Sequence, residues 1–133
     1  MMFILLLPVS FYPLASLLLS AVMGLSVDIF SSGALGVHMA ACVATAYLRS
    51  HLLRNMLSST DLQIEVPLPA KSPFRRYISY TLILVFAHHS VLFILETFDI
   101  SEMGYIFPKI LISGMVSAAM VTLLELVVIR FRN

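Results

Sequence analysis

The chain has 133 residues, of which 60% are hydrophobic and 11% are charged, and its formal net charge is +1. A soluble domain usually carries about a quarter of charged residues, and a chain this short has too little interior to hide so much apolar surface from water. The composition therefore argues against a soluble domain, and the small net charge gives no indication of nucleic-acid binding. We expect an all-α integral membrane protein with a single transmembrane domain covering residues 1–133.

The apolar stretches predict a bundle of about four transmembrane helices, because one span needs about 20 apolar residues. Residues 1–13 are apolar but contain two prolines, so they are expected to form only a partial helix. The spans are predicted at about residues 14–30, 36–56, 77–98 and 106–129.

Two connections between the spans have a clear sequence signature. Gly33 and Gly36 lie between the first two spans and predict a tight turn, because glycine adopts unusual backbone angles at little cost. Residues 58–73 are polar and contain three prolines, which predicts an exposed loop between the second and third spans.

The basic residues are distributed unevenly and orient the bundle. Seven of the eight lie beside or in the 58–73 loop, or after the last span: Arg49, Arg54, Lys71, Arg75, Arg76, Arg130 and Arg132. The opposite side carries only Lys109, against three carboxylates. The positive-inside rule places the basic side in the cytoplasm, so the loop and both termini are predicted to be cytoplasmic, an N-in/C-in topology.

Ionisable residues inside a membrane are costly, so each needs a partner or a task. Asp28, His38 and Glu96 all fall near the outer ends of their spans. Because their depths match, we expect these three side chains to form one polar cluster between helices.

The adjacent residues His88 and His89 fall near the middle of the third span. Neighbours on a helix point about 100° apart, so the two rings cannot easily hold one ion, and no zinc-binding spacing is present. Interhelical hydrogen bonds are the expected role, while a proton relay through His89 and Glu96 is an alternative.

Two further features concern the inner half of the bundle and the last span. Arg49 and Glu125 fall at matching depth, so they either form a pair or share a network, unless Arg49 extends to the lipid headgroups. Gly114 and Ala118 form a small-xxx-small pattern, which allows helices to pack closely within this bundle or in a dimer.

No constellation typical of an enzyme is present. The single cysteine, Cys42, lies in an apolar run and is expected to be a buried small side chain. Phosphate-binding loops, nucleophile motifs and paired carboxylates at a catalytic spacing are absent from the sequence. We therefore expect a protein that is not an enzyme and that uses no metal or cofactor.

Three segments resemble the family of rod shape-determining protein MreD, in its Bacteroidetes-type form. The run GLSVDIFSSGALGVHMAACVATAYLR, residues 24–49, resembles the signature in which an aspartate ends one helix, a short Leu-Gly turn follows, and an Ala-rich helix ends in an aromatic-Leu pair. The segments FILLLP (3–8) and AHHSVLFILETF (87–98) resemble other helices of that subgroup. Members usually have more chain ahead of Phe3, so this chain is short by comparison, either because its start codon is assigned too late or because the protein is natively short.

The resemblance implies a non-enzymatic subunit of the cell-elongation machinery in the bacterial inner membrane. Its implied partners are an MreC-like protein and, with it, a RodA-type peptidoglycan polymerase and its transpeptidase, with cytoplasmic MreB contacted indirectly. No small-molecule substrate is then expected. The alternative is a small-molecule-binding subunit of an energy-coupling-factor-type vitamin transporter, and a proton-conducting subunit is a third reading. An enclosed polar cavity would favour transport, and a packed core would favour the scaffold.

Overall fold

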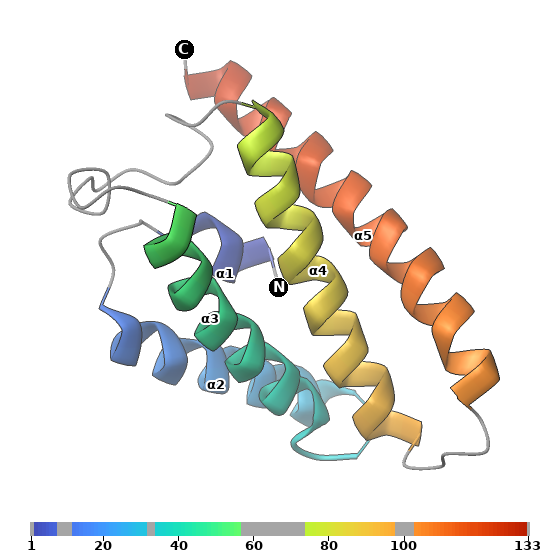
Figure 1. Ribbon diagram of the computed structural model, residues 1–133. Helices are drawn as coiled ribbons and strands as arrows, with labels where there is room; N and C mark the ends of the chain where they lie inside the picture. Colours follow the sequence, from blue (N-terminus) through green and yellow to red (C-terminus); the bar gives the residue numbers. More distant parts are fainter. Residues whose placement is uncertain (1, 8–11, 32–33, 57–73, 98–102, 133) are drawn as a thin grey trace.

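A computed structural model describes residues 2–7, 12–31, 34–56, 74–97 and 103–132 (Figure 1). Its elements are α1 (Met2–Leu6), α2 (Pro13–Phe30), α3 (Val37–Met56), α4 (Phe74–Thr97) and α5 (Met103–Arg132). The described part of the chain contains no strand, which confirms the all-helical prediction. Each predicted span coincides with one of the helices α2 to α5, while the predicted loop at 58–73 lies outside the described residues.

Within the described part of the chain, three helices are long and apolar enough to cross a membrane, over Pro13–Phe30, Tyr77–Thr97 and Gly104–Leu124. These three helices indicate a membrane protein. The helix α3 coincides with the second predicted span, at about residues 36–56, but is less apolar, because two arginines and a histidine occupy its C-terminal half.

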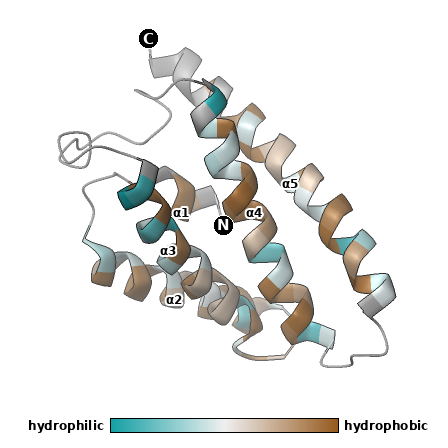
Figure 2. Cartoon of the chain, viewed as in Figure 1, coloured by the Kyte–Doolittle hydropathy of each residue, from teal (hydrophilic) through white to brown (hydrophobic). Residues whose placement is uncertain are grey.

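The helices pack largely in chain order: α2 lies against α3, α3 against α4, and α4 against α5 (Figure 1). The short helix α1 contacts α3 and inserts Ile4 and Leu5 into the interior, where both are almost fully buried. The C-terminal end of α3 and the N-terminal end of α4 lie on the same side of the bundle, and both carry hydrophilic residues (Figure 2). This arrangement agrees with the charge asymmetry of the sequence.

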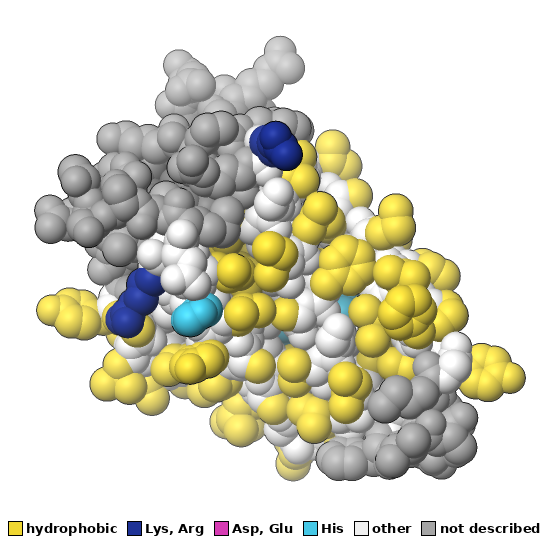
Figure 3. Space-filling model, in the orientation of Figure 1, with side chains coloured by type: hydrophobic (Ala, Val, Ile, Leu, Met, Phe, Trp, Pro, Cys, Tyr) yellow, Lys and Arg dark blue, Asp and Glu magenta, His cyan; other side chains and the backbone are white. Residues whose placement is uncertain are grey.

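The helix α2 buries its smallest and most polar residues and exposes its large apolar ones. Its buried positions recur at every fourth residue: Ser16, Ser20, Gly24 and Asp28. Large side chains such as Leu18 and Phe30 point outward, and apolar side chains cover much of the surface shown in Figure 3. Such a surface is unfavourable in water but suits lipid, where close backbone approach and hydrogen bonds between helices hold a bundle together.

Among the described residues, the larger of two apolar clusters joins four helices around the C-terminal half of α3. It contains Leu5, Leu53, Tyr77, Tyr80, Leu84 and Val121. The predicted partial helix at the N-terminus is therefore part of the packed interior, because its leucine meets side chains of α3, α4 and α5.

Candidate functional site

The carboxylate of Asp28 binds the beginning of the next helix. Its Oδ2 accepts hydrogen bonds from the backbone N–H of Gly36 at 2.9 Å and of Met39 at 3.0 Å. Its Oδ1 accepts from the backbone N–H and the ring Nδ1–H of His38, both at 2.9 Å. The first N–H groups of a helix lack partners within the helix and carry a partial positive charge. Asp28, which is 1% exposed, therefore caps α3 from the end of α2.

Two glycines make this approach possible. Gly36 has φ of +96°, the left-handed conformation that side chains disfavour, so the turn expected here is confirmed at Gly36, whereas Gly33 lies outside the described residues. Gly24 lies one turn before Asp28 and faces the start of α3. A Cβ atom added to Gly24 would lie 2.4 Å from the Cα of Met39, so only glycine allows the two backbones to meet this closely.

Glu96 does not belong to the Asp28–His38 pair, so the expected three-residue cluster is wrong in this respect. The side chain of Glu96 is exposed, and it makes no hydrogen bond or ion pair with a described residue. The prediction used only the position of Glu96 along its helix. Because α4 packs against α3 and α5, the exposed Glu96 lies on the face of α4 that contacts neither helix. Within the Asp28–His38 pair the carboxylate can only accept, so the Nδ1 of His38 is the donor.

His88 and His89 each join α4 to a different neighbour. The Thr45 hydroxyl of α3 donates to the carbonyl of Ala41, so it accepts from the Nδ1–H of His88 at 3.1 Å. The Nε2 of His89 lies 2.9 Å from the Ser117 hydroxyl of α5. Interhelical hydrogen bonding, the expected role, is confirmed for both histidines. Among the described residues, no three side chains of the usual ligand types gather where they would hold a metal ion.

Removing the Ser117 hydroxyl is expected to loosen the contact between α4 and α5. Interhelical hydrogen bonds in membranes contribute about 0.6 kcal/mol on average, so Ser117→Ala should lower the free energy of unfolding by about that amount. Ser113→Ala is the matched control, since Ser113 lies one turn away on α5 and makes no side-chain hydrogen bond with a described residue. Unfolding by denaturing detergent measures both. Equal effects of the two substitutions would contradict a role for the His89–Ser117 bond.

Arg49 lies inside the bundle. Its side chain is 2% exposed, and its Nη2 donates a 2.6 Å hydrogen bond to the backbone carbonyl of Leu7, just after α1. The alternative in which Arg49 extends to the lipid headgroups is therefore wrong, because its guanidinium is enclosed by protein. The predicted pairing with Glu125 lies outside the described residues, since that side chain is not among them.

The small residues of α5 pack within the bundle. Gly114 faces α4, and a Cβ added to it would lie 2.7 Å from the Phe86 ring. Ala118 is 7% exposed and lies one turn further along the same face. Of the two uses predicted for this pattern, packing inside the bundle is the one observed.

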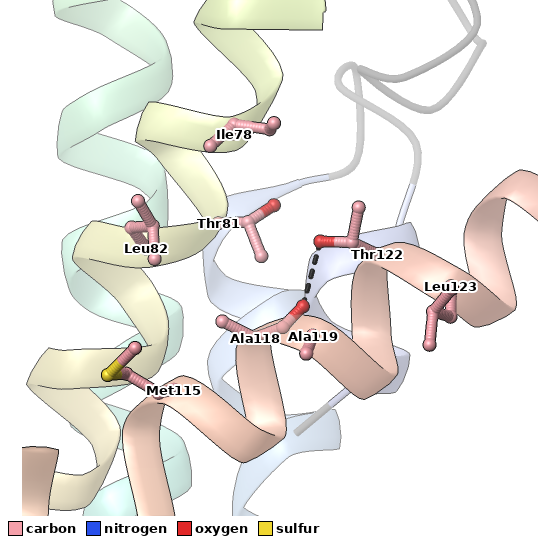
Figure 4. Close-up of a pocket in the computed structure, with 8 residues that line it drawn as sticks. All are labelled: Ile78, Thr81, Leu82, Met115, Ala118, Ala119, Thr122 and Leu123. Carbon is pink, nitrogen blue, oxygen red and sulfur yellow. Dashed lines mark hydrogen bonds between the residues drawn. The ribbon is translucent and has the colours of Figure 1, made fainter. Parts of the chain in front are cut away.

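An open groove of about 450 Å³ runs between α4 and α5 (Figure 4). It is lined by Ile78, Thr81, Leu82, Met115, Ala118, Ala119, Thr122 and Leu123. The Thr122 hydroxyl donates to the carbonyl of Ala118. The Thr81 hydroxyl is buried and has no hydrogen-bond partner among the described residues, although Thr45, Thr97 and Thr122 all donate to the carbonyl four residues earlier.

The chain matches no family model, no curated protein and no solved structure. Three described polar contacts join neighbouring helices: Asp28 with His38 joins α2 to α3, Thr45 with His88 joins α3 to α4, and His89 with Ser117 joins α4 to α5. The groove, by contrast, is open to the side and mainly apolar, which suits contact with another apolar surface rather than enclosure of a polar molecule.

Proposed function

We propose that this protein is a non-enzymatic inner-membrane subunit of the cell-elongation machinery, similar to MreD, which works by binding the helices of partner proteins. The partners proposed are an MreC-like protein, a RodA-type polymerase and its transpeptidase, with MreB contacted indirectly. The observation that carries the proposal is that polar and apolar side chains of the bundle make different kinds of contact. Polar groups such as Asp28 and His88 are used between its own helices, while an apolar groove stays open toward the membrane.

The residues behind the resemblance also support the proposal. Gly24, Asp28, Gly36 and His38 all belong to the segment that resembles MreD, and all four lie at the contact between α2 and α3. A signature whose members meet at one helix contact is consistent with a common fold.

The proposed topology has four spans, with both termini and the 58–73 loop in the cytoplasm. The helix α3 would be the remaining span, between α2 and α4, although it is less apolar than the other three. Its most costly residue for a membrane, Arg49, is turned into the protein and hydrogen-bonded, which lowers the cost of crossing.

A vitamin-binding subunit would require an enclosed cavity with polar groups for its ligand. The groove between α4 and α5 is instead open, and six of its eight lining side chains are apolar. A partner helix can place apolar side chains in such a groove. The geometry therefore favours contact with a helix over binding of a small polar molecule.

Depletion of the protein is expected to convert rod-shaped cells into round ones, and the tagged protein is expected to co-purify with the MreC-like protein. Ala119→Phe fills the groove from an exposed position and should reduce this co-purification roughly tenfold, the loss expected when about 1.4 kcal/mol of contact energy is removed. Val116→Phe is the matched control, because Val116 is 59% exposed on the same helix and does not line the groove.

The two arms of this experiment have separate meanings. Depleted cells that keep their shape and lose uptake of a vitamin would overturn the proposed function. If depleted cells become round and expression of the Ala119→Phe variant restores both the rod shape and the co-purification, the proposed function stands. The groove is then excluded as the partner contact.

A further inference from the structure

The two arginines of α3 point to opposite environments. Arg49 is enclosed by the bundle, whereas Arg54, five residues later, is exposed. Five residues correspond to about 140° of rotation around the helix axis, which places the two side chains on different faces. The helix therefore uses one arginine inside the protein and presents the other to the surroundings.

Arg54 belongs to an exposed stripe on α3. Tyr47 and His51 precede it by seven and three residues, a spacing that places all three on one face, over about 10 Å along the helix. Tyr47 is 69% exposed, and His51 is exposed as well. Both His51 and Arg54 are exposed, and neither makes a hydrogen bond or ion pair with a described residue.

The surroundings of this stripe are positively charged. Arg75, at the beginning of α4, is also exposed and lies at the same end of the bundle. The face in Figure 3 shows Lys or Arg side chains at two places and a histidine over this part of the molecule, with apolar side chains beside them and no carboxylate in view. There are two described carboxylates, Asp28 and Glu96. They lie near the C-terminal ends of α2 and α4, away from Arg54 and Arg75.

We propose that the stripe Tyr47–His51–Arg54 binds the phosphate headgroup of an anionic phospholipid. The stripe lies on the side of a membrane bundle, so a lipid is the molecule it meets first. Arginine donates in a fork that fits phosphate oxygens, and tyrosine belongs to the residues enriched at the boundary between hydrocarbon and headgroups. A headgroup with a net negative charge is favoured because Arg54 and Arg75 are both exposed at this end of the bundle.

The test uses the purified full chain and counts the lipids it retains by native mass spectrometry. Phosphatidylglycerol and phosphatidylcholine of the same acyl chains are offered in equal amounts. The unaltered protein is expected to retain phosphatidylglycerol preferentially. Arg54→Gln should weaken this retention about fivefold, the effect of one basic residue near an anionic surface. Because Arg54 is exposed, the variant is expected to fold.

Lys109→Gln is the matched control, since Lys109 is exposed on α5 away from the stripe. It should retain phosphatidylglycerol as the unaltered protein does, and an excess of inorganic phosphate should not displace the lipid. Equal retention of the two lipids, an equal loss in both variants, or displacement by phosphate would each overturn the proposal. No partner protein is present in this experiment, so its outcome is independent of the proposed role in cell elongation.

Discussion

Replacing Asp28 by alanine is expected to lower the free energy of unfolding by about 3 kcal/mol. The carboxylate accepts three backbone N–H groups and one ring N–H, and alanine leaves all four without their acceptor at the end of a helix. The same change removes the negative charge that balances the positive end of α3. Unfolding of the purified protein by denaturing detergent, followed by circular dichroism, measures the loss.

Two further variants separate the cap from a general sensitivity of α2. Asp28→Asn keeps one acceptor oxygen, so it should lose roughly half as much stability as the alanine variant. Ser26→Ala removes only a hydroxyl that bonds to the carbonyl of Val22 in its own helix, and a change within about 0.5 kcal/mol is expected. If Asp28→Ala were as stable as Ser26→Ala, the cap would contribute nothing to the fold.

The helices were predictable because a membrane imposes simple rules on sequence. A span must be apolar over its length, so runs of apolar residues separated by polar segments mark its ends. Asp28 and His38 were predictable as neighbours for a similar reason, since a short turn brings the ends of two adjacent helices together. The divergence of His88 and His89 followed directly from the rotation of about 100° per residue.

Depth in the membrane does not determine the direction in which a side chain points. Glu96 lies near the end of α4 but faces outward, because the rotation of α4 is set by its packing against α3 and α5. The acceptor of Arg49 was also unpredictable, since it is the backbone carbonyl of Leu7 and any residue carries one. Contacts to backbone atoms leave no residue type in the sequence by which they can be recognised.

The close approach at Gly24 was missed for a different reason. Small residues at intervals of four are common in membrane helices by chance, so the series Ser16, Ser20 and Gly24 is a weak signal alone. Its meaning becomes clear only with Asp28 as the fourth member, because the aspartate fixes which face of α2 meets α3. The sequence therefore contained one usable signal: the small residues and the aspartate of α2 recur at the same four-residue spacing.

Gly24→Ala is expected to reduce the free energy of unfolding by about 3 kcal/mol, because overpacked interiors force the backbone to move. Alanine is the better helix former by about 1 kcal/mol, so the clash must exceed this gain. At Gly24 it does, since the added Cβ would meet the backbone of Met39 at 2.4 Å, and neither helix can yield without disturbing the Asp28 cap.

The other two helical glycines provide controls of graded severity. At Gly104 an added Cβ meets nothing within 4 Å, so Gly104→Ala should leave stability unchanged or raise it by up to about 1 kcal/mol. At Gly114 it meets the Phe86 ring, which can turn aside, so an intermediate loss is expected. Detergent unfolding should therefore rank the variants with Gly104→Ala most stable and Gly24→Ala least. If Gly24→Ala were as stable as Gly104→Ala, the two backbones would have room that the structure does not give them, and the close packing of α2 on α3 would be wrong.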